Sequence, residues 1–354
     1  LNGTGTDGPG VAINNASVVR SGAGNVTLTG TTGSGPRGVE VFSSLVDTGG
    51  GTLSVSSSQG VLFGTSSLLT GGGNVTMHGG GPGLAGAGTV ELKGESGGTY
   101  GLVMGSVAGS VTGSTLDLGG RTAVGSTAPG LVLVNQSLTG ANGVMLTAEN
   151  GDLNLTSTTV TATAGTASLT ALVNPPGPAP APLPGIILTG ASAVSAVASS
   201  GMDGVTLTAD RVDLTGTVNA GAKRVVILPS TLTRPISLGG TDETGKLNLT
   251  STELNNITAG VIVVGRSDMT GGITLESGTP MGLTAPALSL IQSNTASITQ
   301  VPTSGLNIAG LNADAGSVSL MAANNSIGAI SGNATTLFEM ANMGPITVGA
   351  VDVV

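Results

Sequence analysis

Cysteine, basic clusters and most charge are missing from this chain of 354 residues. The absence of cysteine excludes a disulfide framework and thiolate chemistry. Charged residues make up 8% of the chain, against about 25% in an average globular protein. The ten basic residues are scattered, and only Lys223 and Arg224 are adjacent. No basic stripe is therefore available to neutralise the phosphates of a nucleic acid or the surface of an anionic membrane.

Aromatic side chains are almost absent as well. The sequence holds no tryptophan, one tyrosine and three phenylalanines. A groove that stacks sugar rings needs aromatic side chains, so the composition argues against a polysaccharide-binding or polysaccharide-degrading protein. That class remains the alternative function.

Glycine and aliphatic residues are abundant instead. The chain contains 62 glycines, 39% of its residues are hydrophobic, and its net charge is −9. Disordered chains combine low hydrophobicity with high net charge. This chain has enough apolar surface to bury, so we expect it to fold.

One short strand phrase recurs along the chain. It begins with Gly or Asn and continues with apolar and polar residues in alternation, which is the period of a β-strand. The copies are Asn25–Thr29, Asn74–Met77, Gly88–Leu92, Gly143–Thr147, Gly204–Thr208, Gly245–Leu249 and Gly316–Leu320. Repetition of one short strand is typical of a solenoid.

Several of these phrases lie about 26 to 28 residues apart. The spacings run from Val26 to Leu53, Val90 to Leu116, Leu116 to Val144, Leu247 to Ile273 and Val318 to Ile346. Two or three short strands in each period match one coil of a parallel β-helix, with Gly and Asn at the corners, where positive φ is often needed. The sequence therefore predicts an all-β parallel β-helix, with an antiparallel barrel or sandwich as the second choice.

We expect residues 1–354 to form one continuous β-solenoid segment of a longer protein. The proline-rich segment 174–185 is predicted to be a surface loop of that solenoid; the alternative is a linker between two solenoids, 1–173 and 186–354. Ala191–Ser200 is the best helical candidate. The uncharged stretch Leu153–Met202 is too rich in Thr, Ser, Gly and Pro to form a membrane-spanning helix.

No group of residues indicates catalysis, a metal or a cofactor, and we expect none. The single histidine, His78, is interpreted as an exposed corner residue. Two acidic sets are close enough in sequence to be candidate calcium ligands, but we interpret them as isolated surface carboxylates: Asp203, Asp210 and Asp213, and Asp242 with Glu243. A further set shows no common register for a pectinase-like site: Glu91, Glu95, Asp117 and Asp152.

Asn-x-Ser/Thr triplets are frequent, and some of them are candidate glycan acceptors if the chain is exported. The candidates are Asn25, Asn74, Asn135, Asn154, Asn248 and Asn256.

The stretch 247–265, with Leu247-Asn248-Leu249-Thr250 and Val261-Ile262-Val263-Val264, resembles a recurring unit of giant bacterial surface proteins. Gly271–Leu275 and Asn324–Gly328 are similar to the same unit. These are the filamentous-haemagglutinin-like, β-strand-repeat proteins. The resemblance is compositional over the whole chain and motif-like over about 247–349. It implies a right-handed parallel β-helix, export to the cell surface, and a role as adhesin, stalk or matrix fibre.

The sequence therefore predicts an extracellular structural or adhesive protein, not an enzyme, that forms a stiff rod or filament on the bacterial surface or in a biofilm matrix. We expect self-association, by end-to-end coil stacking or strand exchange, because neither Leu1 nor Val354 lies in a polar cap. A surface glycan or a host or cell receptor is a candidate partner. Nucleic-acid binding and membrane insertion are not expected.

Overall fold

The structure is a computed structural model. It describes the chain except for residues 22–23, 33–38, 43, 48–52, 58–60, 65–66, 70–74, 78–83, 86–88, 96–101, 105–108, 123–127, 174–182, 277–280 and 352–354. The described residues form strands and one short helix. They divide into two compact units, Leu1–Val194 and Ser195–Val354, and each unit is described by itself.

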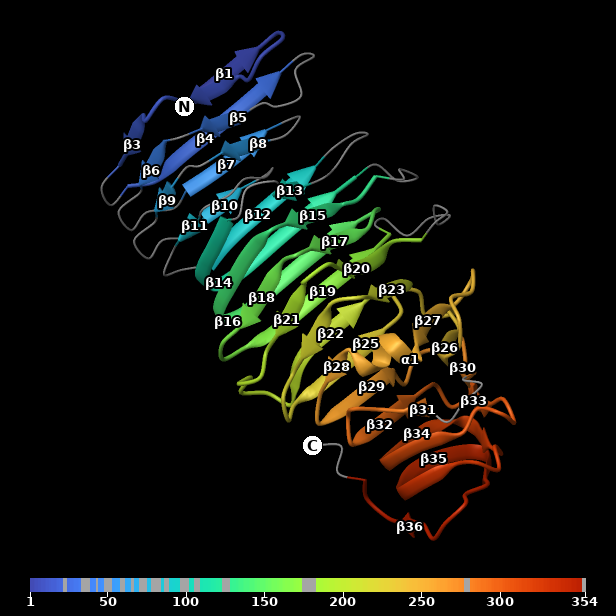
Figure 1. Cartoon of the computed structure of the whole chain (residues 1–354). Helices are drawn as coiled ribbons and strands as arrows, with labels where there is room; N and C mark the ends of the chain where they lie inside the picture. Colours follow the sequence, from blue (N-terminus) through green and yellow to red (C-terminus); the bar gives the residue numbers. More distant parts are fainter. Residues whose placement is uncertain are drawn as a thin grey trace. The chain divides into compact units, whose positions relative to one another are not determined.

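The first unit, drawn from blue to green in Figure 1, consists of short strands. They are β1 (Asn2–Gly5), β2 (Val11–Ile13), β3 (Val18–Arg20), β4 (Val26–Thr32), β5 (Val39–Phe42), β6 (Leu45–Asp47), β7 (Leu53–Ser57), β8 (Val61–Gly64), β9 (Ser67–Leu69), β10 (Val75–Met77), β11 (Leu84–Ala85), β12 (Thr89–Glu95), β13 (Leu102–Met104), β14 (Gly109–Arg121), β15 (Leu131–Val134), β16 (Gln136–Glu149), β17 (Leu153–Thr156), β18 (Thr159–Ala162), β19 (Thr166–Leu172) and β20 (Gly185–Thr189). The strand β21 (Ala193–Ser195) spans the boundary between the units.

These strands stack on three faces, and every described pairing is parallel. The first face runs β1–β4–β7–β10–β12 and continues through the second halves of β14 and β16 to β19. The second face contains β2–β5–β8 and β13–β15–β17–β20. The third face runs β3–β6–β9–β11 and continues through the first halves of β14 and β16 to β18. The chain visits the three faces in turn, which makes a parallel β-helix.

Register aligns apolar residues into inward columns. Leu118 pairs with Leu146, and Leu146 pairs with Leu169; all three are fully buried. Met145, the neighbour of Leu146 in β16, points outward and is 46% exposed. This alternation is the period of two that the sequence pattern predicts.

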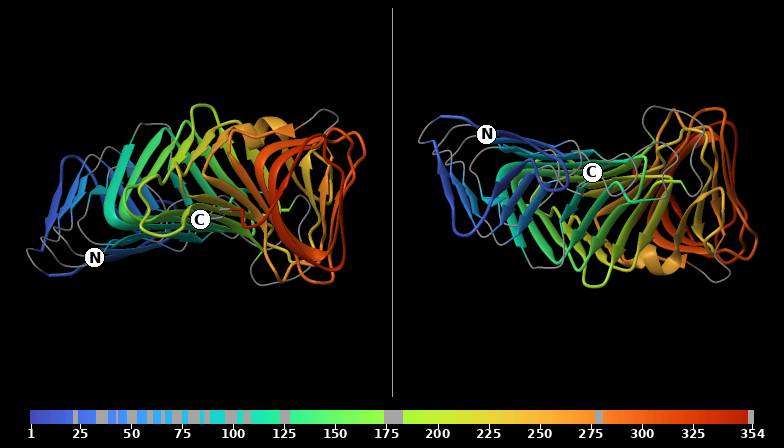
Figure 2. Two further views of the ribbon diagram at one scale, coloured as in Figure 1. Left: turned by 90° about the horizontal axis from the view of Figure 1, so that it is seen from below. Right: turned by 90° about the horizontal axis from the view of Figure 1, so that it is seen from above.

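The second unit, drawn from yellow to red, repeats the arrangement (Figures 1 and 2). Its strands are β22 (Asp203–Thr208), β23 (Arg211–Leu214), β24 (Thr217–Asn219), β25 (Arg224–Leu228), β26 (Ile236–Gly239), β27 (Leu247–Thr250), β28 (Ile257–Thr258), β29 (Val261–Gly265), β30 (Ile273–Leu275), β31 (Met281–Gly282), β32 (Ala287–Ile291), β33 (Ser297–Gln300), β34 (Leu306–Leu320), β35 (Ser326–Met340) and β36 (Thr347–Val348), with the helix α1 (Ser251–Asn255).

The first face of this unit runs β22–β25–β29–β32 and ends with segments of β34, β35 and β36, again in parallel. Its inward column consists of Val225, Ile262, Leu288 and Leu311, paired in that order, and all four are fully buried. The prediction of an all-β parallel β-helix is therefore confirmed.

Three of the five predicted spacings correspond to paired strands. Val26 pairs with Leu53, and Leu116 pairs with both Val90 and Val144. The other two are wrong. The partner of Val318 on β35 is Phe338, not Ile346.

The spacing from Leu247 to Ile273 fails because an extra strand is inserted. Leu247 of β27 and Ile273 of β30 both pair with Ile236, so β26 lies between β27 and β30. The chain thus steps forward to β26 and back to β27, and it then forms α1. The sequence pattern does not reveal this step, because β27 has the same Leu-Asn-Leu-Thr sequence as β17, an ordinary strand of the first unit.

Corners contain Gly and Asn, as expected. Asn15, Asn135 and Asn150 have positive φ, as do several corner glycines. Asn150 is buried; its Nδ2 donates to the carbonyl of Thr122 at 3.0 Å, and the Thr122 hydroxyl donates to the Asn150 carbonyl at 3.1 Å. The side chain thus satisfies backbone groups that the tight corner leaves out of the strand ladder.

The structure bears on the predicted helix and on the predicted proline-rich loop. Ala191–Ser200 is not a helix, because β21 and a turn occupy it. Of the proline-rich segment, residues 174–182 lie outside the described part. The strand before the segment, β19, and the strand after it, β20, belong to the same unit. Leu153 of β17, earlier in that unit, pairs with Ile186 of β20. Continuity of the solenoid over the whole chain stays a prediction.

Candidate functional site

The predicted glycan acceptors occupy unlike environments. Asn25 and Asn135 are exposed, Asn154 is half-buried, and Asn74 lies outside the described residues. The remaining two use the nitrogen that would carry a glycan. Asn248 donates Nδ2 to the carbonyl of Glu243 at 2.7 Å, and Asn256 donates Nδ2 to the carbonyl of Leu214 at 2.7 Å. Asn248 is also buried, and the exposed candidates are Asn25 and Asn135.

The candidate calcium ligands Asp203 and Asp210 bind different partners in the structure. Asp203 accepts from Nε of Arg224 at 2.6 Å, and the buried Asp210 accepts from the amide of Thr231 at 2.9 Å. Across the described ranges no group of three or more His, Cys, Asp or Glu could hold a metal ion. His78 falls outside those ranges.

Two of the four acidic residues considered for a pectinase-like site are paired in the structure. Glu91 of β12 pairs in register with Asp117 of β14, whereas Glu95 pairs with Arg121. Arg121 also pairs with Glu149 of β16, and its Nε lies 3.5 Å from Oε2 of Glu149. The stacking of coils, not spacing along the chain, decides which of these residues are neighbours on adjacent strands.

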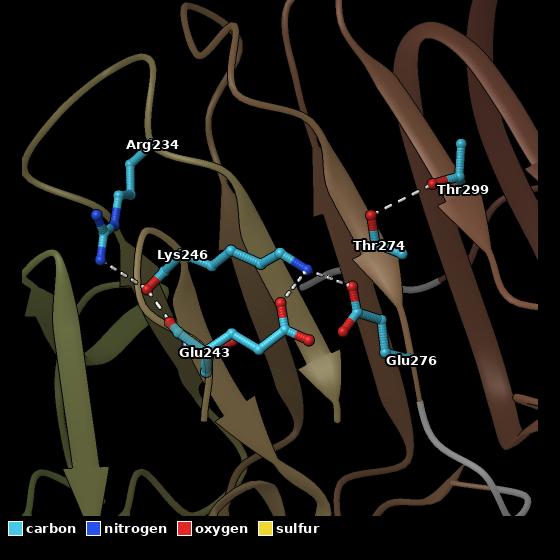
Figure 3. A network of polar contacts seen from close by, with 7 residues as sticks. Arg234, Glu243, Lys246, Thr274, Glu276 and Thr299 are labelled. Carbon is cyan, nitrogen blue, oxygen red and sulfur yellow. Dashed lines mark hydrogen bonds and ion pairs between the residues drawn. The ribbon is translucent and has the colours of Figure 1, made fainter. Parts of the chain in front are cut away.

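The densest charged cluster lies where the extra strand is inserted in the second unit (Figure 3). Lys246, just before β27, places Nζ 2.8 Å from Oε2 of Glu243 and 2.7 Å from Oε1 of Glu276. Glu243 belongs to the loop between β26 and β27, and Glu276 follows β30. Lys246 therefore links the two strands that flank β26. We call these three residues the lysine bridge.

Arg234 extends the lysine bridge toward the preceding loop. Its Nη2 donates to the carbonyl of Lys246 at 2.8 Å. Burial lowers the pKa of Arg234, and the charge of Asp210 acts in the opposite direction. On the far side, the hydroxyls of Thr274 and Thr299 lie 3.4 Å apart on neighbouring strands β30 and β33 (Figure 3). The arrangement is a line of polar contacts across successive coils.

A second acidic residue is buried beside the insertion. Glu253 of α1 accepts at Oε1 from the amide of Leu214 at 3.0 Å, and at Oε2 from the amide of Thr250 at 2.8 Å. The amide of Glu253 in turn donates to the Thr250 hydroxyl, which completes a capping box at the helix start. Burial raises the pKa of Glu253, against the hydrogen bonds that favour its charged form.

These groups are suited to holding strands together. The hydrogen bonds that Lys246 donates to Glu243 and Glu276 raise its pKa, so its ammonium stays charged and does not act as a base or nucleophile near neutral pH. The two carboxylates are both engaged by one cation. The lysine bridge and Glu253 thus fasten β27 and α1 to the regular strands around them.

Sequence reasoning missed this cluster. Lys246, Glu276 and Arg234 meet only because β26 and β27 are out of chain order, and no periodicity signals that. Glu253 had a local signal, since Thr250-x-x-Glu253 is a capping-box pattern. No helix in the described part of the chain is long and apolar enough to cross a membrane.

The last coil presents a different surface. On one side β35 pairs with β34 from Asn307–Ser326 to Leu320–Met340. On the other side Ala329 and Ile330 pair with β36, and the amide and carbonyl of Ile327 bond to the side chain of Asn342; the described residues give this side of β35 no further strand partner. Phe338 stacks on the fully buried Val318 yet is 40% exposed, because no described strand covers it. The core of the β-helix is thus open at this end.

Comparison with protein-family models, with curated proteins and with solved structures finds no match in any of the three.

Replacing Lys246 by Met should lower the free energy of unfolding by about 1 kcal/mol, because Glu276, which is 17% exposed, loses its cation. Arg266→Met is the matched control, since Arg266 and Asp268 form a more exposed pair. Urea unfolding at low and high salt measures both effects. Equal losses in the two variants would contradict a special role for the lysine bridge.

Glu253 should make stability depend on pH. A carboxyl whose pKa is raised in the folded state stabilises the fold fully below its ordinary pKa, and this contribution is lost as pH rises through the raised value. Glu253→Gln keeps an acceptor for the Leu214 amide and does not titrate. Urea midpoints of both proteins, from acid to neutral pH, should therefore diverge in favour of the variant. Parallel pH profiles would show that burial of Glu253 carries no such linkage.

Proposed function

We propose that this chain is an extracellular structural and adhesive protein, which forms a stiff rod or filament at a bacterial surface or in a biofilm matrix. Support begins with the fold. Within each unit, parallel coils bond to each other through the backbone, so each coil stiffens the next. Polar outward residues such as Thr147 and Thr170 accompany inward leucines on these strands.

The polar groups that do gather are engaged with each other. Lys246 forms ion pairs with Glu243 and Glu276, and the buried Glu253 accepts a hydrogen bond from the backbone amide of Leu214. This arrangement supports a structural role for the cluster, which holds neighbouring strands together. That the chain is not an enzyme stays a prediction, as do its location, its receptor and its export.

The observation that carries the proposal is the open last coil. Its edge from Ser331 to Met340 has no partner strand among the described residues, and of its inward residues Phe338 is 40% exposed and Met340 is half-buried. Such an edge is a hazard in a monomeric protein, because it templates pairing with another strand. In a rod that grows by stacking, the same edge is the assembly contact.

Electron microscopy of the purified chain over a range of concentrations tests the proposal. We expect linear particles whose length increases with concentration, because each added molecule extends the same stack. Dispersed particles of one length at every concentration would contradict assembly by end-to-end stacking.

A further inference from the structure

The second unit has an apolar strip on its outer surface that the strand pattern does not predict. Val261 and Val263 of β29 point outward, opposite the inward Ile262 and Val264, yet they are 2% and 6% exposed. Ala287 of β32 pairs with Val261 and is 7% exposed. Both faces of the sheet are therefore covered here.

The cover is Val351. This residue, itself 8% exposed, packs in one cluster with Val261, Val263 and Ala287. Val351 lines a groove of about 410 Å³ together with small residues that include Gly260, Ala309, Gly310 and Ala329. We call it the outer groove.

The absence of a side chain at Gly310 leaves room for this contact. A Cβ added at Gly310 would lie 2.8 Å from Cγ1 of Val351, closer than carbon atoms approach without a shift. Gly310 pairs in register with Ala287 on one side and Ala329 on the other. The missing side chain in this outward column thus makes the hole that the valine fills.

Val351 belongs to a segment that folds back over the last coil. We call residues Ala341–Val351 the C-terminal strap. It begins with hydrogen bonds from the amides of Ala341 and Met343 to the carbonyls of Leu320 and Asn325, at 2.9 and 2.8 Å. It then crosses the open end through β36 and turns back toward the level of β32 (Figure 1).

Between these two attachments the strap pairs through β36 with Ala329 and Ile330, but it leaves apolar side chains exposed. Val348 of β36 is 81% exposed and Met343 is 72% exposed. A cavity of about 490 Å³ is lined by residues of the strap and of the last coil, namely Ile330, Phe338, Met340, Ile346 and Val348. The strap therefore covers the apolar end of the core without filling it.

We propose that the C-terminal strap is a removable latch, held by Val351 in the outer groove, and that its release lets the last coil bind the first coil of a second copy of the chain. This inference rests on the proposed function and assigns a regulation to its assembly contact.

A second copy fits the open end because it continues the stacking already present. Phe338 lies above Val318 and Met340 lies above Leu320 in the inward columns, and below them every inward residue has a partner coil. Another parallel coil would pair with the backbone edge of β35 and cover these side chains at the same time. In the first coil β1, β2 and β3 pair with β4, β5 and β6, and their opposite edges have no partner in the described residues.

Charge does not oppose this contact. The single charged residue of β35 is Glu339, which accepts a hydrogen bond from the Ser319 hydroxyl at 2.7 Å. The first coil contributes Arg20 on β3, and Asp7 in the turn between β1 and β2. An edge with so little charge lacks the usual protection of natural edge strands against pairing.

The test compares the full chain with two variants that release the strap from opposite sides. Val351→Asp places a charge in the outer groove, and Gly310→Val fills the hole that Val351 occupies. Met343→Asp is the matched control, because it adds the same charge to an exposed position of the strap. Gly344→Val is the control for the glycine, since a Cβ there meets nothing within 4 Å.

Sedimentation velocity and electron microscopy give the concentration at which linear assemblies form, and hydrogen exchange at the Gly349 amide reports whether the strap is docked. We expect both release variants to assemble at a concentration about tenfold or more below that of the wild type, and both controls to match the wild type. Adding Phe338→Lys to Val351→Asp should abolish assembly, because it puts a charge on the end of the core.

Three results would overturn the inference. Release variants that assemble no more readily than the wild type would show that the strap is not a latch, while leaving the proposed filament function intact. Assembly of the Val351→Asp, Phe338→Lys double variant would show that the exposed groove, not the last coil, makes the contact. Failure of every variant to assemble would contradict the latch and the self-association proposed above.

Discussion

The structure depends on one constraint, which is that each coil must repeat the one below it at the spacing of hydrogen-bonded strands, about 4.8 Å. Backbone bonds run along the stack, so an inward side chain lies directly on its partner in the next coil. The column Val225, Ile262, Leu288 and Leu311 shows the result, with all four side chains fully buried. Aliphatic side chains repeat well at this spacing, and the near absence of aromatic residues follows from it.

The same constraint explains where the charge gathers. A regular coil satisfies its backbone through its neighbours and needs few polar side chains. Where β26 and β27 break the order, the ladder is interrupted, and side chains complete it. Lys246 joins Glu243 to Glu276 there, and Glu253 receives the Leu214 and Thr250 amides. The charged cluster is thus a consequence of the inserted strand.

The ends of the stack meet the constraint in another way. The last coil has one partner, and its inward Phe338 and Met340 lack the residues that would cover them. The C-terminal strap covers this end only in part, and it is anchored on the outer surface through Val351 and the hole at Gly310. The proposed assembly contact and its latch therefore arise from the same open edge.

The repeated strands could be predicted because stacking imposes a pattern on the sequence itself. The alternation in Gly143–Thr147 and the 28-residue step from Leu116 to Val144 both report a coil directly. The inserted strand could not be predicted, because Leu247–Thr250 looks like any other repeat. The outer groove was also missed. Val261-Ile262-Val263-Val264 reads as one apolar run, and the residue that covers it, Val351, is far away in sequence.

Parallel, in-register stacking can be measured directly in a chain that has no cysteine of its own. Thr147 of β16 and Thr170 of β19 are outward partners, while Thr147 and Ser168 are two residues out of register. Partner Cα atoms lie about 4.8 Å apart and the shifted pair about 8 Å apart, and a disulfide spans about 4.4 to 6.8 Å. Mild oxidation should cross-link Thr147→Cys with Thr170→Cys and leave Thr147→Cys with Ser168→Cys open. Equal or better cross-linking of the shifted pair would contradict the stacked coil.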